Sequence, residues 1–158
     1  MFHVVDESKT GEAYLSQVTR LLLTAERAHE RLFDGVVPPV IHFEMEFPVP
    51  RGRVDALVIH DDGSATVCEI KDGTQGMQSV LAGIGQVIAY AVQVGMSRGV
   101  VNGIRKALLF SRTPSIMDDI LIVEACEAAG VLPVAMGSVR EHKESLEKIR
   151  LAATENHA

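Results

Sequence analysis

The sequence predicts one α/β domain built around a mixed sheet, and three observations support that class. The chain has 158 residues, of which 47% are hydrophobic and 23% are charged, and these values are typical of a single globular domain. Segments with the two-residue alternation of strands are interspersed with segments of helical periodicity. Three strand-like segments follow one another closely, so we expect an antiparallel meander before the later helices. The expected order is αβββαβαβ, followed by a final helix.

The first expected elements are a helix over residues 12–33 and a strand over residues 41–47. Apolar residues recur at three- and four-residue steps in the helix. Gly35 and the two prolines that follow should end it, because proline has no amide hydrogen to donate and restricts the residue before it. Strict alternation from Ile41 to Phe47 predicts a strand with one buried face.

The remaining elements follow from the same two patterns. The expected strands cover residues 54–60, 65–71, 106–110 and 131–136, and the expected helices cover residues 77–94, 115–129 and 138–152. A turn at Asp61-Asp62-Gly63 should join the first two of these strands as a hairpin. We expect one domain over residues 1–153 and a flexible tail over residues 154–158.

One uncharged segment, residues 73–97, must be compared with a membrane-spanning helix, which needs about 20 apolar residues. Four glutamines interrupt it, and Gly83 and Gly85 loosen it, so a buried helix of a soluble domain is the better interpretation. Cys68 and Cys126 form neither a zinc-site spacing nor a disulfide framework. The N-terminus has no secretory signal. We therefore expect a cytoplasmic protein that does not contact a membrane.

Three polar residues occupy strand positions where apolar residues would be expected. Asp55 begins the second strand just before an apolar run, and Glu69 and Lys71 lie two residues apart in the third. Residues two apart in a strand share a face. A hairpin would place Asp55 roughly opposite Glu69 and Lys71, so two carboxylates and one ammonium group should meet at the end of the sheet.

Such a cluster would suit a hard divalent cation. Mg²⁺, or Mn²⁺ in its place, prefers oxygen ligands, and Asp55, Glu69 and the backbone carbonyl of Ile70 could supply three. The cation would lower the pKa of a bound water and neutralise charge on a phosphate, while Lys71 would be the catalytic amine. The alternative is an exposed cross-strand ion pair of little energetic weight.

Two further polar residues lie in the apolar helix, where Gln86 and Tyr90 are one turn apart on one face. Together with Asp55 and the Glu-Ile-Lys run of the third strand, they resemble the PD-(D/E)XK nuclease superfamily. The Gln-x-x-x-Tyr spacing resembles its RecB-type branch. The order αβββαβ over residues 12–110 also resembles the restriction-endonuclease-like core of that superfamily, and the last helix, strand and helix would be a C-terminal extension.

This resemblance implies Mg²⁺-dependent hydrolysis of phosphodiester bonds in DNA, and less often in RNA. It implies that the aspartate and the glutamate hold the metal, that the lysine is catalytic, and that Gln86 and Tyr90 act near the site. Members of the superfamily often add a glutamate from the first helix. Glu12 is the first candidate and Glu26 the second, although Glu12 would also suit the helix dipole.

The charged residues are unevenly distributed along the chain. The net charge is −6, yet no acidic residue lies between Asp72 and Asp118. That stretch contains four basic residues that could form a positively charged path for DNA: Arg98, Arg105, Lys106 and Arg112. The alternative is that these residues form only a solvated face.

We therefore expect a metal-dependent nuclease that cleaves DNA with a metal-activated water. Such a small domain has few means of reading bases, so cleavage should depend on DNA structure or on strand ends. The alternative is a nuclease-fold nucleic-acid-binding or regulatory subunit with little activity in the absence of a partner. A homodimer would suit the nuclease, because two sites cut two strands more easily, whereas the acidic charge and small size favour a partner protein for the subunit.

Overall fold

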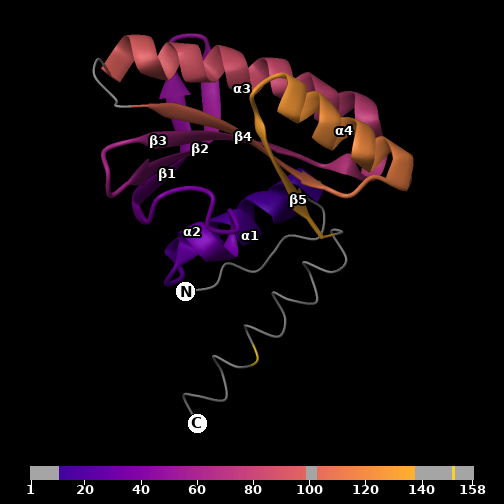
Figure 1. Cartoon of the computed structure of the whole chain (residues 1–158), viewed down its shortest axis with the longest axis horizontal. Coiled ribbons are helices and arrows are strands. Elements are labelled where there is room, and N and C mark those ends of the chain that lie inside the picture. Colours follow the sequence, from indigo (N-terminus) through magenta and orange to yellow (C-terminus); the bar gives the residue numbers. More distant parts are fainter. Residues whose placement is uncertain (1–10, 99–102, 138–150, 152–158) are drawn as a thin grey trace.

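A computed structural model describes residues 11–98, 103–137 and 151 of the chain (Figure 1). The helices are α1 (Gly11–Thr24), α2 (Ala28–Arg31), α3 (Met77–Arg98) and α4 (Ile116–Ala128), and a short 3₁₀ helix, η1 (Gly73–Gln75), precedes α3. The strands are β1 (Val40–Val49), β2 (Gly52–His60), β3 (Ala65–Lys71), β4 (Ile104–Ser111) and β5 (Leu132–Met136).

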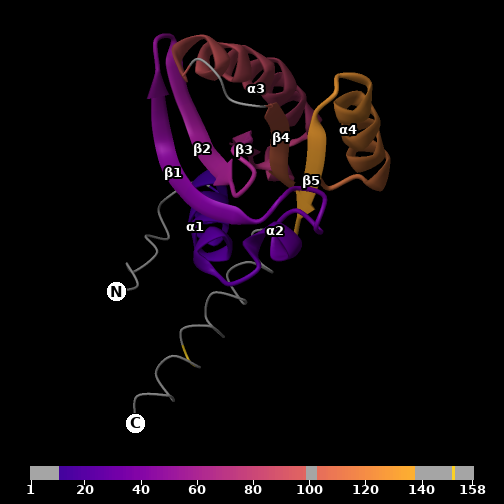
Figure 2. The same ribbon diagram turned by 60° about the vertical axis from the view of Figure 1, so that its left-hand side comes forward.

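The five strands form one mixed sheet in the order β1-β2-β3-β4-β5. The first three pair antiparallel as a meander, whereas β4 runs parallel to β3 and β5 runs parallel to β4. Helices α3 and α4 lie on one face of the sheet, and α1 and α2 lie on the other (Figures 1 and 2). The predicted α/β class with a mixed sheet flanked by helices is therefore confirmed. Because β3 and β4 are parallel, their carboxyl ends lie at the same edge of the sheet.

Each face of the sheet has its own apolar core. Leu15, Phe33 and Ile70 belong to the cluster between the sheet and α1, and Val80 and Leu108 belong to the cluster beneath α3 and α4. Strand β3 lies between β2 and β4 and is buried on both faces over most of its length. This position explains its nearly continuous apolar sequence, and it makes a glutamate within the strand unusual.

Helix α3 is the segment that raised the membrane question. By length and composition, Met77–Ser97 could cross a bilayer. In this structure the helix lies along the sheet, and Val80, Val87 and Val94 of its inner face are buried in the core. The packing agrees with the interpretation of this segment as a helix of an α/β domain.

The first predicted helix differs from the observed one. The sequence predicts a continuous helix over residues 12–33, but α1 and α2 are separated by a break in which Arg27 has a φ of 57°. A left-handed residue cannot continue a right-handed helix. Leu32 and Phe33, just after α2, are both buried in the core, so the burial of these side chains outweighs helical continuity.

Other predicted boundaries shift only slightly. Strands β1, β2 and β4 extend beyond their predicted ranges, because neighbouring strands pair with residues that do not alternate in polarity. The predicted helix 138–152 and the tail 154–158 lie outside the described residues, apart from Leu151, which is helical and exposed.

Candidate active site

The predicted site lies where β2 and β3 separate. Their paired residues run from Ile59 opposite Ala65 to Ala56 opposite Cys68, and the pairing between these two described strands stops there. Asp55 is the next residue of β2, and its Oδ2 atom accepts a hydrogen bond of 2.7 Å from the backbone N–H of Ile70. The carboxylate thus satisfies a β3 donor at the point where the strands part, and this bond fixes Asp55 beside β3.

Glu69 and Lys71 extend from β3 beside this carboxylate. The Lys71 Nζ atom lies 3.9 Å from Glu69 Oε1, and the two side chains are only 16% and 7% exposed. The other carboxylate oxygen of Glu69, Oε2, is buried and has no hydrogen-bond partner among the described residues. Burial, followed by the negative charge of Asp55 and by a hydrogen bond that the protonated carboxyl of Glu69 can donate to Asp55, raises the pKa of Glu69 to about 9, although Lys71 opposes this shift. The structure therefore brings the three predicted residues into one cluster.

Glu12 approaches the same cluster from the first turn of α1. Burial raises its pKa, the charge of Lys71 lowers it, and the charges of Asp55 and Asp72 raise it. The second candidate, Glu26, is exposed and follows the far end of α1. At about 1.5 Å per residue the two glutamates are about 20 Å apart along the helix direction. Of the two, only Glu12 is placed to act with the β3 residues.

Gln86 and Tyr90 are placed differently. Gln86 is exposed on α3, and Tyr90 packs on the start of β2, where a Cβ atom added to Gly52 would lie 2.8 Å from its ring. The next turn of α3 holds the same region, because Gln93 Oε1 accepts a 2.7 Å hydrogen bond from the N–H of Arg51. Within the described residues, neither Gln86 nor Tyr90 hydrogen-bonds to the carboxylates or to Lys71. Tyr90 therefore contacts the strand that carries Asp55, and its predicted role in the reaction stays a prediction.

The three residues of the proposed DNA path whose side chains the structure describes do not form one group. Arg105, near the start of β4, donates a 2.7 Å hydrogen bond to the hydroxyl of Ser64 beside the β2–β3 turn. Arg112 follows β4 at its other end, next to the carboxyl end of β3. At about 3.3 Å per residue, these two arginines are about 20 Å apart. Lys106 lies beside Arg105, and the side chain of Arg98 is outside the described part of the structure. Of the three described members, Arg112 is the one at the end of the sheet that carries the carboxylates.

A network that the sequence did not indicate holds the end of β3 in place. The buried hydroxyl of Ser111 accepts a 2.8 Å hydrogen bond from the N–H of Gly73 and donates one of 2.9 Å to Asp72 Oδ1. Asp72 also accepts from the N–H and hydroxyl of Thr74. The Asp-Gly pair is visible in the sequence as a turn, but its partner lies 38 residues farther along and could not be inferred. This network anchors the chain immediately after Lys71.

The carboxylate pair fits a hard divalent cation. No group of three or more His, Cys, Asp or Glu side chains in the described ranges is arranged to hold a metal. Two carboxylates would therefore need further ligands, which a backbone carbonyl, water and phosphate can supply for Mg²⁺. The unpaired, buried Oε2 of Glu69 is the observation that favours a cation here. Asp55, Glu69 and the carbonyl of Ile70 are the groups that would hold it.

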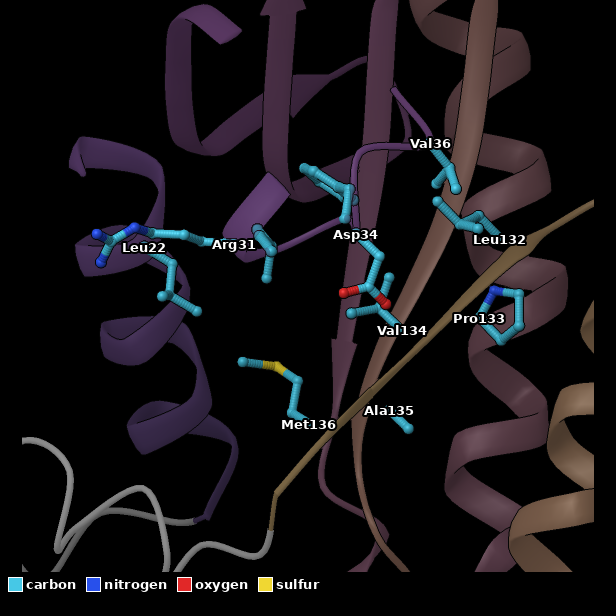
Figure 3. A pocket seen from close by; sticks show the side chains of 11 residues that line it. Leu22, Arg31, Asp34, Val36, Leu132, Pro133, Val134, Ala135 and Met136 are labelled. Carbon is cyan, nitrogen blue, oxygen red and sulfur yellow. The ribbon is translucent and has the colours of Figure 1, made fainter. Parts of the chain in front are cut away.

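A hollow of about 450 Å³ lies elsewhere, on the face covered by α1 and α2 (Figure 3). Leu22 of α1, Arg31 of α2, Asp34 in the following loop and the residues of β5 line it. None of the predicted catalytic residues contributes to this lining. Its walls are mostly apolar, so it does not have the character of a phosphate site.

Comparison with known proteins supports the fold assignment. No protein-family model and no curated protein matches the sequence. Among solved structures, the chain is similar to the crystal structure of a repair endonuclease from Pyrococcus abyssi, with a TM-score of 0.50 and 15% identity, covering 84% of this chain and 50% of that chain. The fold is restriction-endonuclease-like.

A second similar structure is that of an EndoMS–dsDNA complex, with a TM-score of 0.48 and 17% identity, covering 87% of this chain and 49% of that chain. The chain thus spans about half the length of both solved proteins. At these identities the likeness concerns the fold, and assignment to the RecB-type branch stays a prediction.

Proposed function

We propose that this protein is a metal-dependent nuclease that hydrolyses phosphodiester bonds in DNA. The observation that carries the proposal is the meeting of Asp55, Glu69 and Lys71 where β2 and β3 part, with one oxygen of Glu69 buried and unpaired among the described residues. The buried carboxylate of Glu69 and the partly buried carboxylate of Asp55 repel each other when both are ionised, and Lys71 alone leaves that oxygen unsatisfied. A divalent cation would satisfy it, and would supply Lewis-acid charge for a phosphate and its attacking water.

Each residue would have a distinct task. Asp55 is held by the N–H of Ile70 and would present a fixed oxygen ligand, and Glu69 would present the second. The ammonium group of Lys71, 3.9 Å from Glu69 Oε1, would stabilise negative charge on the phosphate. Glu12 would contribute a further carboxyl group near the same site.

DNA is the proposed substrate because the fold is shared with a repair endonuclease. Arg112, which is exposed beside the carboxyl end of β3, would contact the DNA backbone next to the site. The chain spans half the length of that solved protein. Which DNA structures this chain cleaves, and whether it needs a partner protein for cleavage, are therefore also part of this proposal.

Cleavage by the purified full chain tests the proposal. Single-stranded, double-stranded and branched DNA would be incubated with Mg²⁺ or Mn²⁺ and with wild type, Lys71→Ala, Glu69→Gln or Glu127→Gln. Glu127 is an exposed carboxylate on α4 and serves as the matched control. We expect Lys71→Ala and Glu69→Gln to lose activity by about 100-fold or more, and Glu127→Gln to cleave as wild type does. Equal cleavage by all four proteins would show that the activity comes from another site or a contaminant.

A second candidate function is a nuclease-fold binding or regulatory subunit. The observation that favours it is a row of exposed apolar side chains on the outer face of α4, namely Ile116, Met117, Ile120 and Leu121. Such a row is typical of a surface that contacts another protein. Binding of Mg²⁺ by calorimetry without cleavage of any DNA, followed by cleavage when a partner is added, would favour this function.

A further inference from the structure

Gly83 lies in the interior of α3, where a glycine weakens a helix relative to alanine. It is one of two glycines close together in this helix, and the other is Gly85. Gly83 is buried, whereas Gly85 is exposed. The two positions therefore allow a direct comparison between a glycine that faces the core and one that faces solvent.

The space around the two glycines differs sharply. A Cβ atom added to Gly83 would lie 2.7 Å from Leu108 Cδ1, 3.0 Å from Lys71 Cγ and 3.3 Å from Lys71 Cε. A Cβ atom added to Gly85 would meet nothing within 4 Å. The backbone of α3 at Gly83 thus forms a wall directly against the methylene chain of Lys71.

This wall restricts a side chain that would otherwise be free to move. A lysine has a long flexible stem with a compact charged end. Here the stem lies between α3 and its own strand, next to Leu108, which pairs with Glu69 across β3 and β4. The ammonium group lies beside Glu69, 3.9 Å from its Oε1 atom.

We propose that Gly83 is a positioning residue for Lys71. A glycine at this point lets α3 approach closely enough to hold the lysine stem and direct its Nζ atom toward the Asp55–Glu69 pair. The inference deepens the proposed function and rests on it for the catalytic meaning of the lysine. The contact itself is independent of activity, and it can be measured separately.

The contact is tested by thermal unfolding of the metal-free protein. Gly85→Ala should raise Tm, because alanine favours the helix and meets no obstacle, whereas Gly83→Ala should lower Tm because its methyl group crowds Lys71 and Leu108. In a Lys71→Ala background the lysine stem no longer crowds the added methyl group, so the difference in Tm between Gly83→Ala and Gly85→Ala should become smaller. The same Tm difference in both backgrounds would show that Gly83 does not restrain Lys71.

The positioning role is tested by kinetics with the same variants. Gly83→Ala should lower kcat by about tenfold or more with little change in KM, because a displacement of the catalytic group weakens the reaction more than DNA binding. Gly85→Ala should keep the wild-type kcat. Adding Leu108→Val to Gly83→Ala should restore much of the lost Tm but not kcat, since it frees the apolar side and leaves Lys71 displaced.

The outcomes separate the two proposals. A wild-type kcat in Gly83→Ala, or full recovery of kcat together with Tm in the Leu108→Val double variant, would overturn the positioning role. If the wild type cleaves none of the DNAs, the proposed function is wrong. The Tm values of the Gly83 and Gly85 variants in the two backgrounds would still decide whether Gly83 restrains Lys71.

Discussion

Replacement of Glu69 by glutamine should stabilise the metal-free protein at alkaline pH. Glu69 is 5% exposed, and its Oε2 atom has no partner in the described part of the chain. Burial and the charge of Asp55 raise its pKa to about 9. The folded protein therefore keeps a proton that the unfolded chain, with an ordinary carboxyl pKa, has released. Because the folded state binds more protons, the free energy of unfolding must fall as the pH rises toward 9.

The magnitude follows from the width of the pH interval. Within this window each pH unit corresponds to about 1.4 kcal/mol. Between about pH 7 and about pH 8.5, the wild type should therefore lose about 2 kcal/mol of unfolding free energy from this one group. A glutamine is neutral throughout the interval, so Glu69→Gln should not show the loss.

Urea unfolding in the presence of a chelator measures this difference at the two pH values. Glu127→Gln, which changes an exposed carboxylate on α4, should lose as much stability as wild type. Added Mg²⁺ should restore the wild type at the higher pH, because a ligand that binds only the folded state stabilises it, and it should have little effect on Glu69→Gln. A loss in Glu69→Gln as large as that of the wild type would refute the assignment of the raised pKa to Glu69.

Two further predictions concern other buried polar groups. Burial lowers the pKa of His60, so below about pH 6.5 the unfolded chain binds the proton more readily than the folded protein, and stability should fall on acidification. Urea unfolding in a Glu69→Gln background, between about pH 6.5 and pH 5, tests this prediction. The fall in stability should persist when the exposed control His42 is replaced by glutamine and should disappear in His60→Gln. A fall of stability in both variants would exclude His60 as the cause. Ser111→Ala should cost about 1–3 kcal/mol in the same assay, because a backbone amide loses its acceptor inside the protein. Ser79→Ala, on the exposed face of α3, should change the midpoint little, and equal effects would argue against the Ser111 network.

Much of the fold could be predicted because its signals are local. Alternation along β1 predicts a strand through the pleat, and the turn at Asp61-Asp62-Gly63 predicts that β2 and β3 form a hairpin. Once the hairpin register is set, Asp55 must lie beside the end of β3. In the structure, the carboxylate of Asp55 accordingly accepts a hydrogen bond from the N–H of Ile70.

Other features depended on contacts that no local pattern specifies. The break at Arg27 interrupts a sequence with good helical periodicity, since burial of the residues that follow requires a change in chain direction. The spacing of Gln86 and Tyr90 places them on one face of the helix but does not specify which residues that face contacts. Tyr90 packs against Gly52, and Gln86 is exposed to solvent.

By itself, the sequence determined the order of the five strands and the positions of α3 and α4 to within a few residues, and that an aspartate, a glutamate and a lysine share one end of a hairpin. Those properties follow from backbone periodicity and turn chemistry over short distances. Only the tertiary structure decided that one oxygen of Glu69 is buried and unpaired within the described residues, that Ser111 anchors the end of β3, and that Gly83 forms a wall against Lys71. The physical reason is that burial, pKa and side-chain freedom are set by neighbours that packing brings together from distant parts of the chain.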